Sequence, residues 1–170
     1  MLTPIRGIPP EPLVWEQPSW TRREYALRMG REVVATLRWP GIFGFTAEGE
    51  TADGRYRIRM PNLFSDRAVI HPGDSDSEVA VWEPRWHRGG TVRFPGGRTF
   101  RIRRGDFFGR RLYLEDEAGA VLSILHSRRL FLRQGAQVEV QPGAERVREL
   151  PLLLIIAWYA RLRMHHHHGR

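Results

Sequence analysis

The densest group of chemically capable side chains is an arginine-rich segment, residues 85–111. It contains nine arginines, and Asp106 is its only acidic residue. The planar guanidinium forms paired hydrogen bonds with phosphate oxygens, so such a cluster is suited to a phosphate-bearing ligand. Arg101 and Arg103 alternate with Phe100 and Ile102, which predicts that both arginines face outward from one strand. The candidate anion-binding residues are Arg93, Arg98, Arg101, Arg103, Arg104, Arg110 and Arg111.

Three interpretations of this segment remain open. All 27 basic residues of the chain are arginines, so the segment is also consistent with a solvated strand face in an arginine-rich protein. The second interpretation is an anionic lipid or another phosphate ligand, and the third is a nucleic acid. Four aromatic residues beside the arginines are suited to a membrane–water interface: Trp82, Trp86, Phe107 and Phe108.

No other residue pattern indicates catalysis or a cofactor. The chain has no cysteine, which excludes disulfides, thiolate metal sites and a cysteine nucleophile. Asp74, Asp76 and Glu78 alternate as at the start of a calcium loop, but Val79 and Arg85 stand where that loop needs glycine and glutamate. No phosphate-binding glycine loop or nucleophile elbow is present. We assign no catalytic residue, metal or cofactor, and the sequence leans against an enzyme.

The elements that must position the arginines are short strands separated by turns. Alternating apolar residues predict roughly twelve strands, which is typical of a β-meander. We expect them near 22–28, 32–39, 43–51, 55–60, 66–71, 78–84, 91–94, 98–103, 110–116, 120–126, 129–133 and 136–140.

Four turns predict how neighbouring strands pair. A turn at Asp53-Gly54 would place Glu50 opposite Arg57, and the loop 95–97 would place Val92 opposite Phe100. The loop 117–119 would place Leu114 opposite Leu122, and a turn at 134–135 would place Phe131 opposite Val138. In this register Arg101 and Arg103 have no facing glutamates.

The segment Leu150–Arg163 reads LPLLLIIAWYARLR and predicts a helix that is apolar on all sides. About 14 residues would reach roughly 21 Å, which is short of a bilayer core. Twelve closed strands leave an interior that one apolar helix could fill. The predicted fold is therefore mainly β: a closed barrel of roughly twelve strands enclosing a hydrophobic C-terminal α-helix.

The predicted organisation is a proline-rich arm (1–18), a single domain (19–164) with its central helix at 150–163, and a histidine-rich tail (165–170). The four consecutive histidines of the tail could hold a transition metal, but they resemble a purification tag more closely. The N-terminus has no apolar signal segment. We expect a cytoplasmic protein that associates with membranes peripherally, if at all.

This plan resembles the tubby-like C-terminal domain, and most closely its LURP-one-related and phospholipid scramblase branch. The resemblance is carried by YALRMGREVVATLRW (Tyr25–Trp39), FTAEGETADGRYRIRM (Phe45–Met60) and the terminal LPLLLIIAWYARLR, and it covers about Trp15–Met164. It implies a barrel threaded by the helix and binding of phosphoinositide or other membrane lipid. The acidic calcium segment and palmitoylated cysteines of scramblases have no counterparts here, since VQPGAERVRELP precedes the helix.

The expected function is a non-enzymatic module that binds anionic membrane lipid or another phosphate-bearing ligand through the candidate arginines. The alternatives are a nucleic-acid-binding protein and a scaffold for a protein partner that the sequence does not identify. Fold resemblance alone does not decide between them.

Overall fold

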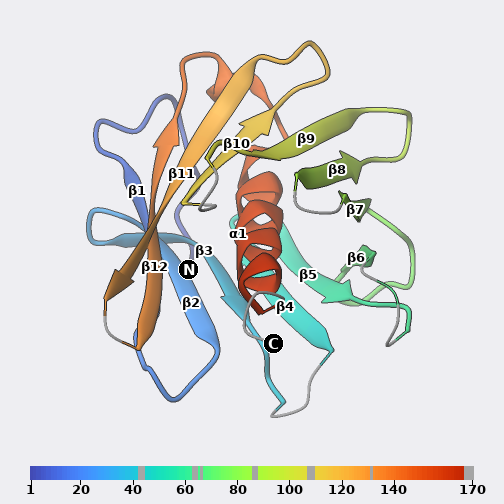
Figure 1. Cartoon of the computed structure of the whole chain (residues 1–170), viewed down its shortest axis with the longest axis horizontal. Coiled ribbons are helices and arrows are strands. Elements are labelled where there is room, and N and C mark those ends of the chain that lie inside the picture. The colour runs from blue at the N-terminus through green and yellow to red at the C-terminus, as the bar shows by residue number, and fades with distance from the viewer. Residues whose placement is uncertain are drawn as a thin grey trace.

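The computed structural model describes residues 1–41, 45–62, 65, 67–85, 88–106, 110–130 and 132–166. Within these residues, twelve antiparallel strands form one closed barrel, and α1 (Leu150–His166) lies along its middle (Figure 1). A short 3₁₀ helix (Ala144–Arg146) precedes α1. The strands are β1 (Leu13–Glu16), β2 (Glu24–Met29), β3 (Glu32–Arg38), β4 (Thr46–Thr51), β5 (Gly54–Arg59), β6 (Ala68–Pro72), β7 (Ala80–Arg85), β8 (Gly89–Arg93), β9 (Thr99–Arg104), β10 (Arg111–Glu115), β11 (Val121–Leu130) and β12 (Arg133–Val140).

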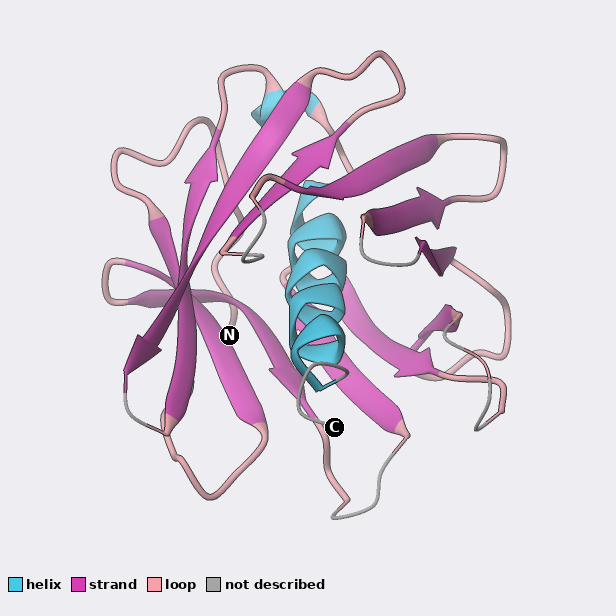
Figure 2. Cartoon of the chain, viewed as in Figure 1, coloured by secondary structure: helices cyan, strands magenta, loops and turns pink. Residues whose placement is uncertain are grey.

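The barrel is a simple meander. Each strand pairs with its neighbours in the sequence, and β1 pairs with β12 to close the sheet around the helix (Figure 2). Because every neighbouring pair is antiparallel, successive connections alternate between the two ends of the barrel. α1 begins at one end, where β12 finishes, and its C-terminus lies at the other.

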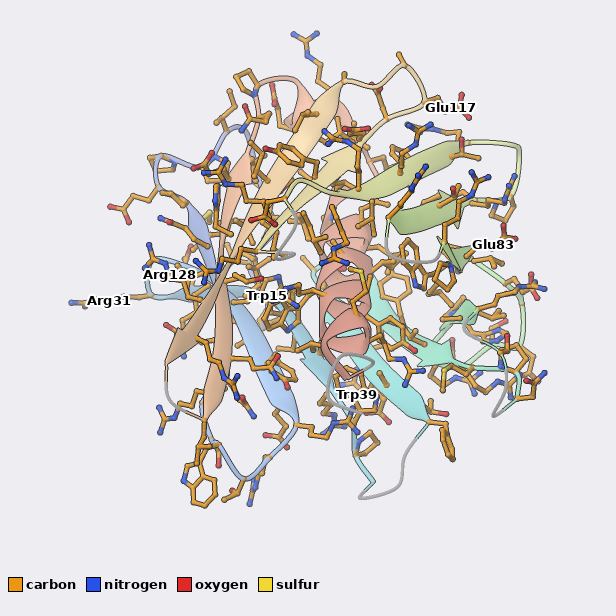
Figure 3. All side chains as sticks on the ribbon, in the orientation of Figure 1. Trp15, Arg31, Trp39, Glu83, Glu117 and Arg128 are labelled. Carbon is orange, nitrogen blue, oxygen red and sulfur yellow. The ribbon has the colours of Figure 1, made fainter. Side chains whose placement is uncertain are left out.

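The barrel interior is filled by α1. From Leu152 to Ala160 every helix residue is buried. Trp158 stacks on Trp15 of β1 with the ring centroids 5.7 Å apart, and Tyr159 stacks on Trp39 at 5.8 Å. Figure 3 shows Trp15 and Trp39 on the side of the sheet that faces the helix. The predicted interior helix and closed barrel are confirmed, and the helix extends past the predicted end at Arg163 to His166.

The predicted N-terminal arm (1–18) is wrong in part, because it includes strand β1. Leu13 and Trp15 are buried, and β1 lies between β12 and β2. A boundary at residues 18 and 19 would therefore cut through the barrel. Residues 1–12 precede the first strand and contain no described strand or helix. The prolines of this region misled the prediction, because β1 is only four residues long and follows Pro12 directly.

Two predicted registers are wrong by a small shift. Thr51 pairs with Gly54, so the turn residues are Ala52 and Asp53, and Glu50 lies opposite Arg55 rather than Arg57. The shift is two residues along β5, so the predicted faces are retained. Between β10 and β11, a bulge at Leu114 and Glu115 places Ser123 opposite Leu114 where Leu122 was expected.

The C-terminal hairpin is longer than predicted. Gly135 lies within β12 opposite Arg128, so the expected turn at 134–135 and the separate strands 129–133 and 136–140 are wrong. Phe131 lies outside the described residues. The pairing of Val92 with Phe100 across β8 and β9 is confirmed.

Candidate functional site

Three of the predicted anion-binding arginines already bind carboxylates. Arg93 lies 3.2 Å from Glu83, and Arg98 lies 2.7 Å from Glu149, which precedes α1. Arg103 lies 2.7 Å from Glu115, whose side chain is only 8% exposed. The expectation that Arg101 and Arg103 have no facing glutamates is therefore wrong: Glu115 lies opposite Arg101 in the sheet, and its carboxylate binds Arg103.

The Arg103–Glu115 pair has a structural role. The Arg103 guanidinium also lies over the Tyr113 ring, 4.6 Å from its centroid. A carboxylate this buried needs a cation, because an unpaired buried charge is strongly unfavourable. Arg103 is thus committed to the strand face and is a poor candidate for a ligand site.

Arg101 fits the prediction better. It is exposed, lies between Thr91 and Glu115 in the sheet, and forms no ion pair with any described residue. The aromatic neighbours do not join it: Trp82 is buried inside the barrel. Trp86, Phe107 and Phe108 lie outside the described residues.

The remaining three predicted arginines lie at one end of the barrel. Arg104 ends β9, and Arg110 and Arg111 stand where β10 begins, close to the C-terminal end of α1. Arg161 of that helix donates from Nε to the Ser127 hydroxyl at 2.5 Å. Burial lowers the pKa of Arg161, nearby Arg104 lowers it further, and Asp106 acts in the opposite direction. The predicted arginines therefore do not form one group. Arg104, Arg110 and Arg111 lie at one end of the barrel, and the other four lie away from it.

This end carries six connections that sequence reasoning did not bring together. By sequence they contain five arginines (Arg22, Arg23, Arg67, Arg88 and Arg110) against two aspartates (Asp66 and Asp106). Arg161 and Arg163 of α1 add two more positive charges. We call this the basic end, formed by the C-terminal turns of α1 and the connections 17–23, 39–45, 60–67, 86–88, 105–110 and 131–132.

The opposite end has the reverse balance. By sequence its connections contain four arginines (Arg31, Arg98, Arg146 and Arg148) against eight acidic residues: Asp53, Asp74, Asp76, Glu78, Asp116, Glu117, Glu145 and Glu149. We call this the acidic end, formed by the connections 30–31, 52–53, 73–79, 94–98, 116–120 and 141–149. The barrel is therefore electrically polarised along the helix axis, and potentials of this kind steer charged partners.

Arginines at the basic end contact rings and sulfur. The Arg23 guanidinium lies 4.4 Å from the centroid of the Trp39 ring, and Arg163 lies 3.0 Å from the Met60 sulfur. Burial lowers the pKa of Arg23, and the neighbouring Arg163 lowers it further, although Tyr25 and Tyr159 act in the opposite direction. A bound anion would offset the repulsion between these two positive charges.

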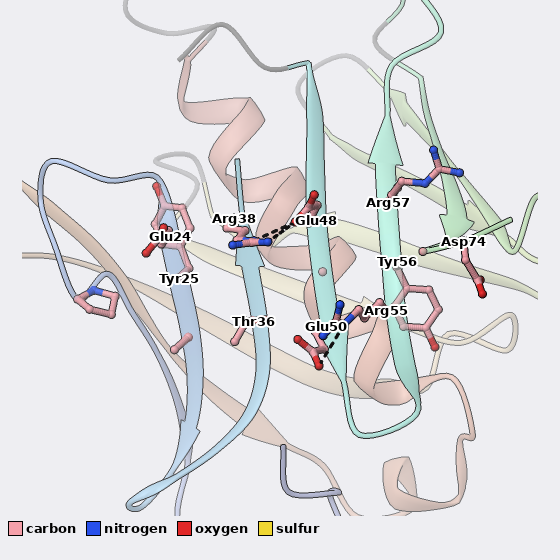
Figure 4. A pocket seen from close by; sticks show the side chains of 14 residues that line it. Glu24, Tyr25, Thr36, Arg38, Glu48, Glu50, Arg55, Tyr56, Arg57 and Asp74 are labelled. Atoms are coloured by element: carbon pink, nitrogen blue, oxygen red, sulfur yellow. Dashed lines mark hydrogen bonds and ion pairs between the residues drawn. The ribbon is translucent and has the colours of Figure 1, made fainter. Parts of the chain in front are cut away.

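A separate surface groove lies on the outer side of β2–β5. The groove has a volume of about 980 Å³. Figure 4 shows side chains that line it, with the helix behind the sheet. Its cations are already neutralised: Arg38 lies 2.7 Å from Glu48, and Arg55 lies 3.7 Å from Glu50. The groove therefore offers an anion no net attraction.

The described residues contain no group of three or more histidine, aspartate or glutamate side chains that could hold a metal ion. Within the predicted calcium-like segment, Asp76 accepts a hydrogen bond from Arg57 at 3.4 Å. His71 is buried, with Nδ1 3.0 Å from the Ser77 carbonyl oxygen. No helix within the described part of the chain has the length and apolarity needed to cross a bilayer.

The fold and the charge distribution together define a polarised, helix-filled β-barrel. The sequence matches no protein-family model and no curated protein. A solved structure, an X-ray structure of a protein from Arabidopsis thaliana, is similar with a TM-score of 0.60 and 14% identity. The match covers 88% of this chain and 91% of that one, so the likeness is one of fold across nearly the whole domain.

Proposed function

We propose that this protein is a non-enzymatic module that binds an anionic ligand, namely membrane phospholipid or another phosphate-bearing molecule, through the basic end of its barrel. The observation that carries the proposal is the opposite charge balance of the two ends. Arg110 of the predicted site belongs to the basic end, and Arg104 and Arg111 border it at the ends of β9 and β10.

The barrel interior supports a surface function. The apolar side chains of α1 occupy the position where ligand-binding barrels keep a cavity. A ligand must therefore meet the outside of the barrel, where exposed arginines are the residue type best suited to phosphate.

The barrel-and-helix plan also supports a tubby-like assignment in the LURP-one-related and scramblase branch. That assignment agrees with lipid as the anionic ligand, and we propose with it a cytoplasmic protein that associates peripherally with membranes. It adds no ligand residues, because none of the family's binding motifs is matched in this chain.

The test compares charge reversal at the two ends. Arg22 and Arg133 are exposed at the basic end, and Arg31 and Arg146 are exposed at the acidic end; none of the four forms an ion pair with any described residue. Figure 3 shows Arg31 extending away from the barrel. The double variants Arg22→Glu/Arg133→Glu and Arg31→Glu/Arg146→Glu change the net charge equally.

Sedimentation with phosphatidylcholine–phosphatidylserine vesicles measures the outcome. An arginine near an anionic surface contributes on the order of 1 kcal/mol, so the basic-end variant should bind at least about tenfold more weakly than the wild type. The acidic-end variant should bind at least as well as the wild type. Equal losses in both variants would show that net charge alone drives binding and would contradict the proposal.

A salt-titrated shift assay with RNA and DNA completes the comparison. Tight binding of a defined nucleic acid without binding to anionic vesicles would replace lipid by nucleic acid as the ligand. Failure to bind either would leave the arginines as a solvated surface and favour a protein scaffold.

A further inference from the structure

Three large apolar side chains are exposed at the basic end. The exposed fractions are 60% for Trp20, 52% for Phe45 and 70% for Leu132. These residues lie in three different connections, β1–β2, β3–β4 and β11–β12. The other exposed large apolar residues of the described chain lie in the N-terminal region and on β1: Met1, Ile8 and Val14.

Trp20 and Leu132 belong to two connections that are held side by side. Gln17 joins them: its amide nitrogen donates to the Arg22 carbonyl at 2.9 Å, and its oxygen accepts from the Gln134 backbone at 3.1 Å. Gln17 is itself buried. The exposed tryptophan therefore stands on a braced connection, which reduces the entropy cost of binding through it.

The two ends also differ in the aromatic residues of their connections. Among the described residues, the connections at the basic end contain Trp20, Trp39 and Phe45, and those at the acidic end contain Phe94. Trp39 packs in the core on Tyr159, but Trp20 and Phe45 are exposed, so burial does not account for these two. A phospholipid surface does favour them, because tryptophan partitions to the membrane–water interface.

Arginines flank the exposed apolar residues. Arg22 follows Trp20 by two positions, and Arg129 and Arg133 border the connection that contains Leu132. All three are exposed and form no ion pair with any described residue. Apolar tips surrounded by arginines match the acyl boundary and phosphate layer of an anionic bilayer.

The dipole of α1 weakly disfavours the binding of anions at the basic end. The C-terminal end of a helix carries about half a negative charge, which would repel phosphate. Arg161 and Arg163 lie in the last turns of α1 and outweigh that half charge. The basic end therefore attracts anions in spite of the helix direction.

We propose that the protein docks end-on to an anionic phospholipid bilayer, with Trp20, Phe45 and Leu132 entering the headgroup–acyl boundary and the surrounding arginines binding lipid phosphates. This inference rests on the proposed function and adds the orientation and the apolar anchors. It identifies the phosphate source as a lipid surface, because free phosphate would make no use of the apolar tips.

The experiment removes apolar groups without changing charge. Trp20→Ala/Leu132→Ala alters the basic end, and Ile8→Ala/Val14→Ala is the matched control away from it. Sedimentation with phosphatidylcholine–phosphatidylserine vesicles gives the affinity, and thermal melting checks the fold. Because all four side chains are exposed, both variants should melt close to the wild type.

We expect the Trp20→Ala/Leu132→Ala protein to bind about tenfold more weakly than the wild type, and the control variant to bind normally. Unchanged binding of Trp20→Ala/Leu132→Ala would overturn the end-on orientation while leaving the anion-binding function intact. A wild-type protein that ignores the vesicles but binds inorganic phosphate would overturn the lipid surface as well.

Discussion

The two ends of the barrel contain equal numbers of connections but use their charged residues differently. At the acidic end, carboxylates complete turns. Asp116 accepts from the Ala120 backbone at 2.9 Å, Glu117 accepts from the Thr99 backbone at 3.1 Å, and Glu145 accepts from the Gly143 backbone at 2.8 Å. Short side-chain acceptors of this kind satisfy backbone groups that a tight turn leaves unpaired.

At the basic end some arginines contact the fold and others are exposed. Arg23 covers an aromatic ring, and Arg163 contacts sulfur. Arg22 and Arg133 are exposed without ion pairs to described residues. Three of the acidic side chains thus have a local folding role, whereas Arg22 and Arg133 have no ion pair to a described residue. This difference supports the proposal that the basic end binds an anionic ligand.

The largest expected effect comes from the core that both ends share. Ile155 is buried in the middle of α1 and lies 3.2 Å from the position where a Cβ on Gly49 would stand. Ile155→Asp would bury an unpaired charge and should destabilise the protein by more than about 4 kcal/mol, which is enough to unfold it.

Circular dichroism and vesicle sedimentation measure this outcome together. Loss of the fold should abolish vesicle binding, because the basic end is assembled from connections that only the closed barrel brings together. A soluble Ile155→Asp protein with wild-type melting would show that the helix is not the core. An unfolded protein that kept full affinity would show that the arginines bind without the barrel.

A smaller effect on stability is expected on the strand face between the ends, where Arg103 is ion-paired with Glu115 and Arg101 is exposed. Arg103→Ala would leave the buried Glu115 carboxylate without its cation and should cost about 1–3 kcal/mol. Arg101→Ala removes an exposed side chain and should cost less than about 0.5 kcal/mol. Urea unfolding of the two variants checks the difference, and equal stabilities would mean that the Arg103–Glu115 pair contributes nothing.

The smallest expected effect concerns the pKa values of two tyrosines, one near each end, which respond to the sign of the nearby charges. Burial raises the pKa of Tyr159 near the basic end, while Arg163 and Arg23 act to lower it. Burial also raises the pKa of Tyr56 near the acidic end, and there Asp53 raises it further. Arg163→Gln should therefore raise the pKa of Tyr159, and Asp53→Asn should lower that of Tyr56.

Alkaline absorbance titration of the two variants measures these shifts. A tyrosine whose pKa is raised by folding stabilises the protein at pH values below its unfolded pKa of about 10, and this contribution is lost as the pH rises through the folded value. Tyr159→Phe should therefore make stability less dependent on pH above about 10. Shifts of the same sign in both charge variants would contradict opposite local potentials.

Local patterns in the sequence predicted the fold well. Leu150–Arg163 is apolar on all sides, so the interior helix followed directly, and alternation located most strands. The strand β1 was hidden because four residues after a proline give too little alternation to recognise. The bulge at Leu114 has no signal in the sequence, and it moved the pairs from Arg111 to Leu114 by one residue, whereas Glu115 keeps the predicted partner Val121.

The candidate site was harder to predict because it is not local. The arginines of residues 85–111 form a continuous segment in the sequence, but pairing with Glu83, Glu149 and Glu115 removes three of them as ligand candidates. The basic end consists of six separated connections and the end of α1. Alternate connections of a meander share an end, so summing their charges would have found it before the structure was known.

The most direct measurement of the central claim compares the depth of the two ends in a bilayer. Since the chain has no cysteine, Thr21→Cys and Ala118→Cys each provide a single labelling site, one at the basic end and one at the acidic end, and both positions are exposed. A nitroxide on each reports its immersion when the protein is bound to phosphatidylcholine–phosphatidylserine vesicles. The basic-end label should lie at the headgroup–acyl boundary and the acidic-end label in water. A bound protein with its acidic-end label immersed, or with both labels in water, would contradict docking through the basic end.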